Sequence, residues 1–283
     1  MAPCWRSRDA SVAAQGGPAQ AARQRLHADF AMMMVERQVA PELLDSLAVD
    51  DPLAVGSRAD LRRINRLMGA ASLLVRALDP LLRESTGPAR VVELGAGDGS
   101  LLLRVAQRRA KDWPQVHLGL LDLHPVVSDD TLQRYRRSGW ECEVLHADVF
   151  DWLARDAMPS TSPRPDAADA PIIIANLFLH HFEGERLAAL VAGIAGRARA
   201  VVCIEPRRSP GALVGSHLLG AIGCNRVTRH DAVVSVRAGF RGSELTALWT
   251  QDDRWQLDEG DAGLFSHRFV AVRAEPRSKA ASA

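Results

Sequence analysis

The chain has 283 residues, of which 47% are hydrophobic and 24% are charged. That length accommodates one large α/β domain with extensions, and a core of this size needs neither disulfides nor a structural metal. The formal net charge of +1 offers no attraction for nucleic acid, and no apolar run is long enough to span a membrane. The four cysteines lie far apart with no Cys-x-x-Cys pair, which argues against a zinc site and indicates a reducing, cytoplasmic location.

The ends of the chain and the segment before the first predicted strand differ in composition. Residues 1–34 contain few large apolar side chains, so we expect a disordered tail or a misassigned start codon there. Residues 274–283 are expected to form a second disordered tail. Between residues 35 and 88, apolar residues recur every three or four positions, which predicts an N-terminal helical cap, or lid, over the next domain. Ser57 and Asp60 have the spacing of a helix-capping pair.

From residue 89 to residue 273 the sequence alternates between short apolar runs and amphipathic segments. Such alternation is typical of β-α-β units with parallel strands. Near the end, two runs separated by a glycine-containing turn predict an antiparallel hairpin. We therefore expect an α/β fold, a doubly wound, seven-stranded, mostly parallel sheet with an antiparallel C-terminal hairpin. The predicted strands are residues 90–94, 116–123, 142–146, 172–177, 200–204, 254–259 and 264–272.

The first predicted strand ends in a glycine-rich turn. Glu93 is followed by Gly95, Gly97 and Gly99. Glycines after a strand let the backbone turn sharply and approach a ligand closely, with the N-terminus of the next helix facing it. A dinucleotide-binding loop has the spacing Gly-x-Gly-x-x-Gly, whereas Ser100 stands where that pattern needs its third glycine. The spacing therefore disfavours a nicotinamide dinucleotide as ligand.

The order acid-x-Gly-x-Gly-x-Gly after a first strand resembles the first motif of class I S-adenosylmethionine-dependent methyltransferases. The resemblance extends over residues 89–272 in the order and spacing of the elements. It implies S-adenosylmethionine as cofactor, with Gly95, Gly97 and Gly99 packed under its methionine half. It also implies that Glu93 helps to hold the ammonium end of the cofactor, directly or through water.

Two further acids close the next two predicted strands. Asp122 ends the second strand, where an acid accepts hydrogen bonds from both ribose hydroxyls of a nucleoside. Asp148 follows the third strand, and the resemblance implies that it receives the adenine amino group while Val149 packs on the ring. Either aspartate could instead be a turn or capping residue. Because the carboxyl ends of parallel strands meet at one edge of a sheet, Glu93, Asp122 and Asp148 are predicted to share one ligand site.

The fourth predicted strand ends at Asn176, and Leu179, His180 and His181 follow. Class I small-molecule methyltransferases often carry Leu-His-His at this place, and the resemblance implies that Asn176 lies beside the transferring methyl group. A hydroxyl acceptor must lose a proton, and a histidine with a pKa of about 6.5 is suited to take it. We favour His181 as this base and keep His180 as the alternative, since one of two adjacent histidines is expected to be a packed or capping residue.

Further candidates follow the fifth predicted strand. Glu205 at its end could orient a histidine or accept from a substrate hydroxyl, and it could equally pair with an arginine at 207–208. His230 lies between this strand and the hairpin, where this family often builds substrate contacts, and it is the second candidate base. Thr228 and Asp231 have the spacing of a helix-capping pair, which would explain Asp231 structurally.

The sequence thus predicts an S-adenosylmethionine-dependent methyltransferase that acts on a small molecule. An oxygen acceptor, phenolic or hydroxylated and apolar, is favoured because histidines rather than a nucleophilic cysteine occur at the predicted site. No nucleic-acid substrate, metal ligand or membrane span is expected, and the oligomeric state stays open. Two alternatives remain: an NAD(P)-dependent oxidoreductase on a Rossmann-type sheet, and a non-catalytic cofactor-binding partner subunit.

Overall fold

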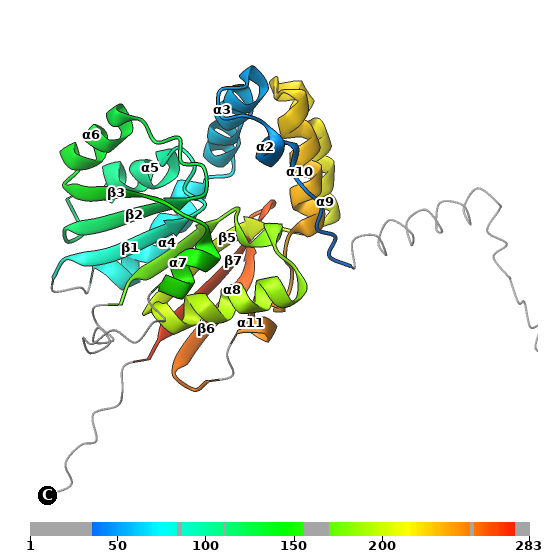
Figure 1. Ribbon diagram of the computed structural model, residues 1–283. Helices are drawn as coiled ribbons and strands as arrows, with labels where there is room; N and C mark the ends of the chain where they lie inside the picture. The colour runs from blue at the N-terminus through cyan, green and yellow to red at the C-terminus, as the bar shows by residue number, and fades with distance from the viewer. Residues whose placement is uncertain (1–35, 84–86, 110, 156–169, 250–251, 275–283) are drawn as a thin grey trace, which may run out of the picture. The chain divides into compact units, whose positions relative to one another are not determined.

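The computed structural model describes residues 36–83, 87–109, 111–155, 170–249 and 252–274. The strands in these ranges form a seven-stranded sheet in the order β3-β2-β1-β4-β5-β7-β6 (Figure 1). Only β7 runs against the other strands: it is antiparallel to both its neighbours, β5 and β6, and with β6 it forms the predicted C-terminal hairpin. The two predicted disordered tails lie outside the described residues, except for residue 274. The strands are β1 (Ala89–Leu94), β2 (Val116–Asp122), β3 (Trp140–His146), β4 (Ile172–Asn176), β5 (Ala200–Pro206), β6 (Trp255–Ala262) and β7 (Ser266–Arg273).

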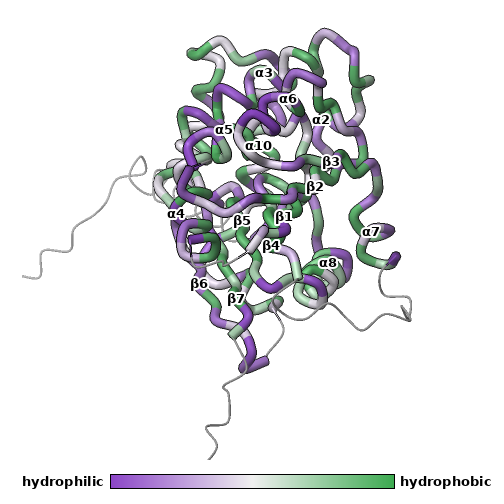
Figure 2. The backbone as a smooth tube through the Cα atoms, turned by 90° about the vertical axis from the view of Figure 1, so that its left-hand side faces the viewer, coloured by the Kyte–Doolittle hydropathy of each residue, from purple (hydrophilic) through white to green (hydrophobic). Residues whose placement is uncertain are grey.

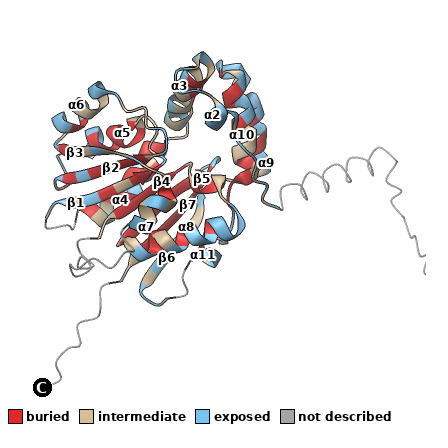
Figure 3. Ribbon diagram, viewed as in Figure 1, coloured by how far each residue is buried: buried red, intermediate tan, exposed pale blue. Residues whose placement is uncertain are grey.

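The two central strands β4 and β5 are buried along their whole length (Figure 3). Ile172 and Ile174 pack into the core on one face of the sheet, and Ile173 packs into the core on the other. This alternation follows from the two-residue period of a strand. Because both faces are covered, the strands are continuous apolar runs, which is the pattern of buried parallel strands. Figure 2 shows these strands as hydrophobic segments inside the fold.

Helices cover the two faces of the sheet. Leu74, Leu78 and Leu82 of α4 are fully buried in the core on one face of the sheet, where α4 packs against β5 and α5. This part of the segment predicted as a cap therefore belongs to the sheet layer, because most residues of α4 are apolar and buried. The helices on the same face of the sheet as α4 (Ala70–Leu82) are α5 (Ser100–Arg109) and α6 (Asp129–Arg137). The helices on the opposite face are α7 (Val149–Arg155), α8 (Gly184–Arg197) and α11 (Glu244–Leu248).

A second group of helices packs around α10, which lies against α2, α3 and α9 (Figure 1). Helices α2 and α3, which are parts of the predicted N-terminal cap, belong to this group. None of the helices in the described ranges combines the length and the hydropathy needed to cross a membrane. The members of the group are α2 (Leu43–Ser46), α3 (Pro52–Leu67), α9 (Pro210–His217), the 3-10 turn η2 (Leu218–Ile222) and α10 (Arg226–Ala238).

The start of α3 differs from the prediction. The helix begins at Pro52, and the carboxylate of Asp51 accepts a hydrogen bond from the amide two residues on, at 2.7 Å. Proline at the first helical position and aspartate at the N-cap are both strongly favoured. The predicted capping by Ser57 and Asp60 is wrong, since both are buried inside the helix. Asp60 instead accepts from the backbone N–H of Asn225 at 2.7 Å, which joins α3 to α10.

The predicted capping role of Asp231 is also wrong. The N-cap of α10 is Asn225, whose side chain accepts from the Thr228 amide at 2.9 Å. The Asp231 carboxylate accepts from the amides of Leu43 and Leu44 at 2.8 and 3.0 Å, so it caps α2. A helix can thus be capped from a distant element, and here this contact ties the N-terminal segment to α10.

The Asp231→Ala substitution should lower the free energy of unfolding by about 0.5–2 kcal/mol, the usual loss for a helix cap. Urea unfolding followed by circular dichroism measures it. Asp130→Ala is the control: Asp130 is an exposed helix residue 3.7 Å from Arg134, so its loss should change stability by less than about 0.5 kcal/mol. Equal effects of the two substitutions would contradict the cap assignment.

Candidate active site

The glycine loop after β1 has an open side. Gly95, Gly97 and Gly99 all have left-handed backbone angles, with φ of 66°, 55° and 68°. A Cβ at Gly95 would lie 2.5 Å from the ring of Phe178, whereas a Cβ at Gly97 would meet no described atom within 4 Å. The loop is therefore packed on one side at Gly95 and free at Gly97 to accept a ligand close to its backbone.

Asp122, at the end of β2, holds this loop in place. Its Oδ2 accepts from the Gly97 amide at 2.7 Å, and its Oδ1 accepts from the His124 amide at 2.7 Å. Each carboxylate oxygen has two lone pairs, so these bonds leave acceptor capacity for ribose hydroxyls. The structure therefore brings Asp122 to the glycine loop, and its predicted contact with ribose hydroxyls stays a prediction.

Glu93 is a buried carboxyl group beside the same loop. It is 3% exposed, and its Oε2 has no hydrogen-bond partner among the described residues. Burial, with smaller contributions from the nearby acids Asp98 and Asp122, raises the pKa of Glu93 well above its usual value. An ionised carboxylate here requires a cation or a hydrogen-bond donor from outside the described residues.

Asp148 and Val149 lie at the start of α7. Asp148 Oδ1 accepts from the amides of Phe150 and Asp151, at 2.7 and 3.4 Å, so this aspartate caps the helix. Val149 is 6% exposed and packs into the core on that face of the sheet. Capping is thus the role seen for Asp148, and contact of the two residues with adenine stays a prediction.

The end of β4 carries a second orphaned oxygen and a strained residue. Asn176 is 9% exposed, and its Oδ1 has no partner among the described residues. Leu177 has φ of 53°, a left-handed conformation that costs a non-glycine residue about 1–3 kcal/mol. The 3-10 turn η1 (Leu179–His181) follows, and Glu205 from β5 accepts from the amides of Phe178 and Leu179 at 3.1 and 2.9 Å. Glu205 therefore fixes the turn that carries the histidine pair.

His180 lies between two carboxylates. Its Nδ1 is 2.8 Å from Glu205 Oε2, its Nε2 is 3.3 Å from Glu42 Oε1, and its side chain is 3% exposed. Burial alone would lower the pKa of His180, but the hydrogen bonds and charges of Glu205 and Glu42 outweigh it and raise the pKa to about 9. The ring is therefore an imidazolium at neutral pH and has no lone pair to take a proton.

His181 has the opposite character. Burial, and next the positive charge of His180, lower the pKa of His181, although Glu42 and Asp45 act against this. The two imidazole rings lie 4.3 Å apart, and Nδ1 of His181 is 3.5 Å from Asp45 Oδ2. Its side chain is 27% exposed, far more than that of His180. His181 is thus a neutral imidazole that solvent or a substrate can reach.

Glu205 and His230 have partners that the sequence left open. Glu205 orients His180 and does not pair with the arginines that follow it, since Arg207 pairs with Asp261 at 2.6 Å and Arg208 pairs with Glu244. His230 lies on α10 with 49% of its side chain exposed, 2.9 Å from Asp231. No hydrogen bond or ion pair within the described ranges joins His230 to the His180–His181 pair.

Glu42 and Asp45 are not among the residues that the sequence predicts for the site. They belong to the N-terminal strap, which we define as residues 37–45. Arg37 in this strap donates to the His180 carbonyl at 2.9 Å, and the Ser235 hydroxyl of α10 donates to Glu42. The only signal in the sequence is the three-residue spacing of the two acids, which also fits a solvated helix face. Their side chains contact the histidine pair only because the folded chain places the strap beside η1.

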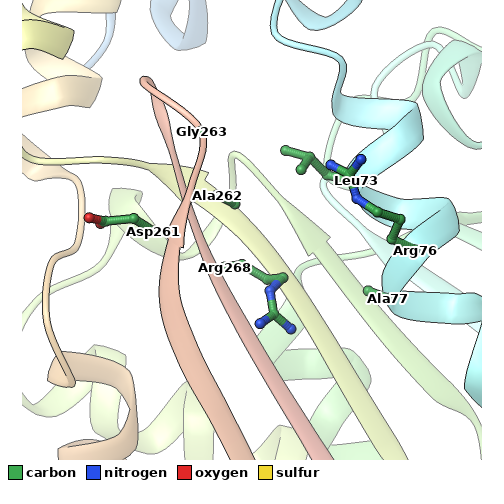
Figure 4. A pocket seen from close by; sticks show the side chains of 7 residues that line it. All are labelled: Leu73, Arg76, Ala77, Asp261, Ala262, Gly263 and Arg268. Carbon is green, nitrogen blue, oxygen red and sulfur yellow. The ribbon is translucent and has the colours of Figure 1, made fainter.

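A cavity of about 400 Å³ lies elsewhere, between α4 and the β6–β7 hairpin (Figure 4). The side chains of Arg76 and Arg268 line it, whereas Asp261 extends away from both. Arg268 already pairs with Asp258 at 2.7 Å. None of the residues predicted for the site lines this cavity.

Comparisons with known proteins give a likeness in fold. No protein-family model and no curated protein matches the sequence. A structure of the plantazolicin methyltransferase BpumL in complex with SAH (S-adenosylhomocysteine) is 11% identical over 89% of this chain and 99% of that chain, with a TM-score of 0.53. Another, of BpumL with a triazolic desmethylPZN analog and SAH, is 11% identical over 88% and 99%, with a TM-score of 0.55. The plantazolicin methyltransferase BamL, in complex with the same analog and SAH, is 10% identical over 89% and 99%, with a TM-score of 0.53.

The sheet order, the helices on both faces and the antiparallel strand β7 next to β5 agree with this likeness. The glycine loop and the acids of β1 and β2 lie at the carboxyl edge of the sheet, where open α/β folds bind their ligands. The chain therefore has the fold of the class I S-adenosylmethionine-dependent methyltransferases.

Proposed function

We propose that this chain is an S-adenosylmethionine-dependent methyltransferase that acts on a small molecule through a hydroxyl group. The fold supports the reaction class, and the plantazolicin methyltransferases of the same fold hold SAH. We propose a reducing, cytoplasmic location, as the widely separated cysteines of the sequence indicate. We propose no nucleic-acid substrate.

The observation that carries the proposal is the unpartnered carboxylate of Glu93 beside the open side of the glycine loop. A buried carboxyl group with a raised pKa is stabilised in its ionised form when a cation comes within hydrogen-bond distance. The cofactor's ammonium group is such a cation. The space at Gly97 lets the backbone approach the methionine half of the cofactor without a side chain between them. The residues present therefore fit this cofactor.

The remaining cofactor contacts follow the carboxyl edge of the sheet. Asp122 would accept from the ribose hydroxyls, and Asp148 and Val149 would contact adenine. Asn176, with its orphaned Oδ1, would lie beside the reacting centre. The cofactor supplies a methyl group already activated as a sulfonium, so the protein mainly aligns the acceptor with it.

His181 is the proposed base for the acceptor hydroxyl. It is neutral at neutral pH and more exposed than its neighbour, so its free nitrogen can take the proton when the acceptor oxygen is methylated. His180, an imidazolium between Glu42 and Glu205, is a positioning residue that keeps η1 and the ring of His181 in place. A phenol or an alcohol must lose its hydroxyl proton when its oxygen is methylated, so it needs such a base.

Isothermal titration calorimetry with SAH, and with NADH as the control ligand, tests the cofactor. We expect SAH to bind in the micromolar range and NADH not to bind. Release of SAH from S-adenosylmethionine is then measured with phenols, alcohols, amines and thiols. Binding of NADH alone would restore the oxidoreductase alternative. Binding of SAH without turnover on any acceptor class would favour a non-catalytic partner subunit.

The Asp122→Ala substitution should weaken SAH binding by about 1–3 kcal/mol, since it leaves buried hydroxyls of the ligand unpaired. Asp122 also holds the Gly97 amide, so Asp122→Asn, which keeps an acceptor oxygen, should retain more affinity. Calorimetry measures the dissociation constant of SAH for both variants. An unchanged dissociation constant for Asp122→Ala would show that the end of β2 is not part of the cofactor site.

A further inference from the structure

We propose that Glu42, His180 and His181 form a binding site for a zinc-like divalent transition-metal ion. This inference goes beyond the proposed function, since it concerns metal binding by the chain alone. One ligand atom from each residue can be chosen so that the three lie within 4.8 Å of one another. Two imidazoles and a carboxylate are a common ligand set for zinc, and a fourth position is often left for water or substrate.

The two sides of the His180 ring differ in geometry. Its Nδ1 lies 2.8 Å from Glu205, the length of an ordinary charge-assisted hydrogen bond. Its Nε2 lies 3.3 Å from Glu42 Oε1, which is long for such a bond. Two ligand atoms that are each about 2.0–2.1 Å from a zinc ion at a tetrahedral angle lie roughly 3.3–3.4 Å apart. The Nε2–Oε1 distance is therefore compatible with two zinc ligands as well as with a long hydrogen bond.

Glu205 completes the arrangement from behind. A metal-binding histidine usually donates its other ring N–H to a carboxylate, which fixes the ring orientation and raises its affinity for the metal. Glu205 is fully buried and occupies that position on His180. It is itself fixed by the amides of Phe178 and Leu179. The site thus has an outer partner as well as ligands.

The charges around the cluster favour a cation. The carboxylates of Glu42 and Glu205 contact His180 directly, and Asp45 lies 3.5 Å from His181. On the other side, the Arg37 guanidinium bonds to the His180 carbonyl rather than to a carboxylate. A dication that replaces the proton of His180 would therefore be compensated by nearby carboxylates. The partly exposed ring of His181 leaves a path from solvent.

Metal binding has a consequence that rests on the proposed function. A nitrogen lone pair that binds a metal cannot take a proton, so His181 would no longer act as the base. The bound ion would then inhibit methyl transfer and leave SAH binding unchanged, since none of the three ligands is among the proposed cofactor contacts.

The test uses the full chain after treatment with a chelator. Zinc ion is titrated by calorimetry, with magnesium ion as the control, because Mg²⁺ prefers oxygen ligands and keeps its waters. We expect one Zn²⁺ per chain and no binding of Mg²⁺. Substitution with Co²⁺ should give the visible absorption of a tetrahedral cobalt site. Equal binding of Zn²⁺ and Mg²⁺ would overturn the proposal.

Variants assign the ligands. Glu42→Gln and His181→Asn should each lower Zn²⁺ affinity by more than the roughly 10- to 100-fold typical of losing an outer partner. His117→Asn is the matched control, because His117 is an exposed histidine 2.8 Å from Glu141, and it should keep full affinity. Circular dichroism checks that each variant is folded. Unchanged affinity in both ligand variants would overturn the site.

The two proposals fail in different ways. If the protein binds Zn²⁺ but not SAH, the metal site stands and the proposed function is contradicted. If it binds SAH but not Zn²⁺, the proposed function stands and the metal site is contradicted. If saturating Zn²⁺ accelerates methyl transfer, the inhibitory role and the assignment of His181 as the base are both overturned.

Discussion

Glu93→Gln should stabilise the ligand-free protein at neutral pH and weaken its binding of SAH. Glutamine has nearly the same shape and an acceptor oxygen, but it cannot ionise in this buried position. We expect the Tm to rise by roughly 2–4 °C, which corresponds to about 1 kcal/mol in a chain of this size. SAH should bind roughly tenfold to hundredfold more weakly, the usual loss of about 1.5–3 kcal/mol for a hydrogen bond to a charged group.

The pH dependence of stability gives a second readout on the same variant. The pKa of Glu93 is higher in the folded chain than its usual value of 4.5, because the folded chain buries the carboxyl group. The unfolded chain therefore releases this proton more readily. Stability is lost as the pH rises above about 4.5 and approaches the folded pKa. Thermal unfolding of the ligand-free protein across this range should show a smaller decline in Glu93→Gln than in the wild type.

The control for this prediction is Glu143→Gln, which changes an exposed glutamate of β3. It should change the Tm by less than about 1 °C and leave the dissociation constant of SAH unchanged. A Glu93→Gln variant that is less stable than the wild type and binds SAH equally well would show that Glu93 is a structural residue with an internal partner.

His181→Asn should lower kcat by about 10²- to 10⁴-fold, the usual contribution of a general base. The chelator-treated enzyme is used, so that metal does not occupy the ring. The dissociation constant of SAH should not change. In the wild type the rate should rise with pH through a value below 6.5, since the pKa of His181 is lowered from that value, and then level off. This rise of the rate with pH should be absent in His181→Asn.

His230→Asn distinguishes the rival base. His230 is half exposed, and no hydrogen bond or ion pair of the described residues joins it to the histidine pair, so this variant should keep both its kcat and its pH profile. A loss of activity in His230→Asn together with full activity in His181→Asn would show that the base is His230 on α10 and not His181.

The sequence by itself determined the sheet and the glycine loop. Both are local signals: buried strands appear as apolar runs, and a glycine series after the first strand marks a turn with left-handed angles. The acid at the end of β2 was predictable for a related reason, because all parallel strands end at the same edge. The contact between Asp122 and the glycine loop agrees with this order of elements, whereas a ligand site shared with Glu93 stays a prediction.

Only the tertiary structure decided how the acids and histidines are paired. Glu205 bonds His180 rather than an arginine, Asp231 caps α2, and Glu42 reaches the His180 ring from a segment that is distant in sequence. A carboxylate accepts from whichever donor the fold brings to it, and its neighbours in the sequence do not specify that donor. The protonation states of His180 and His181 follow from these pairings, because adjacent, chemically identical side chains differ only in burial and in their nearest charges.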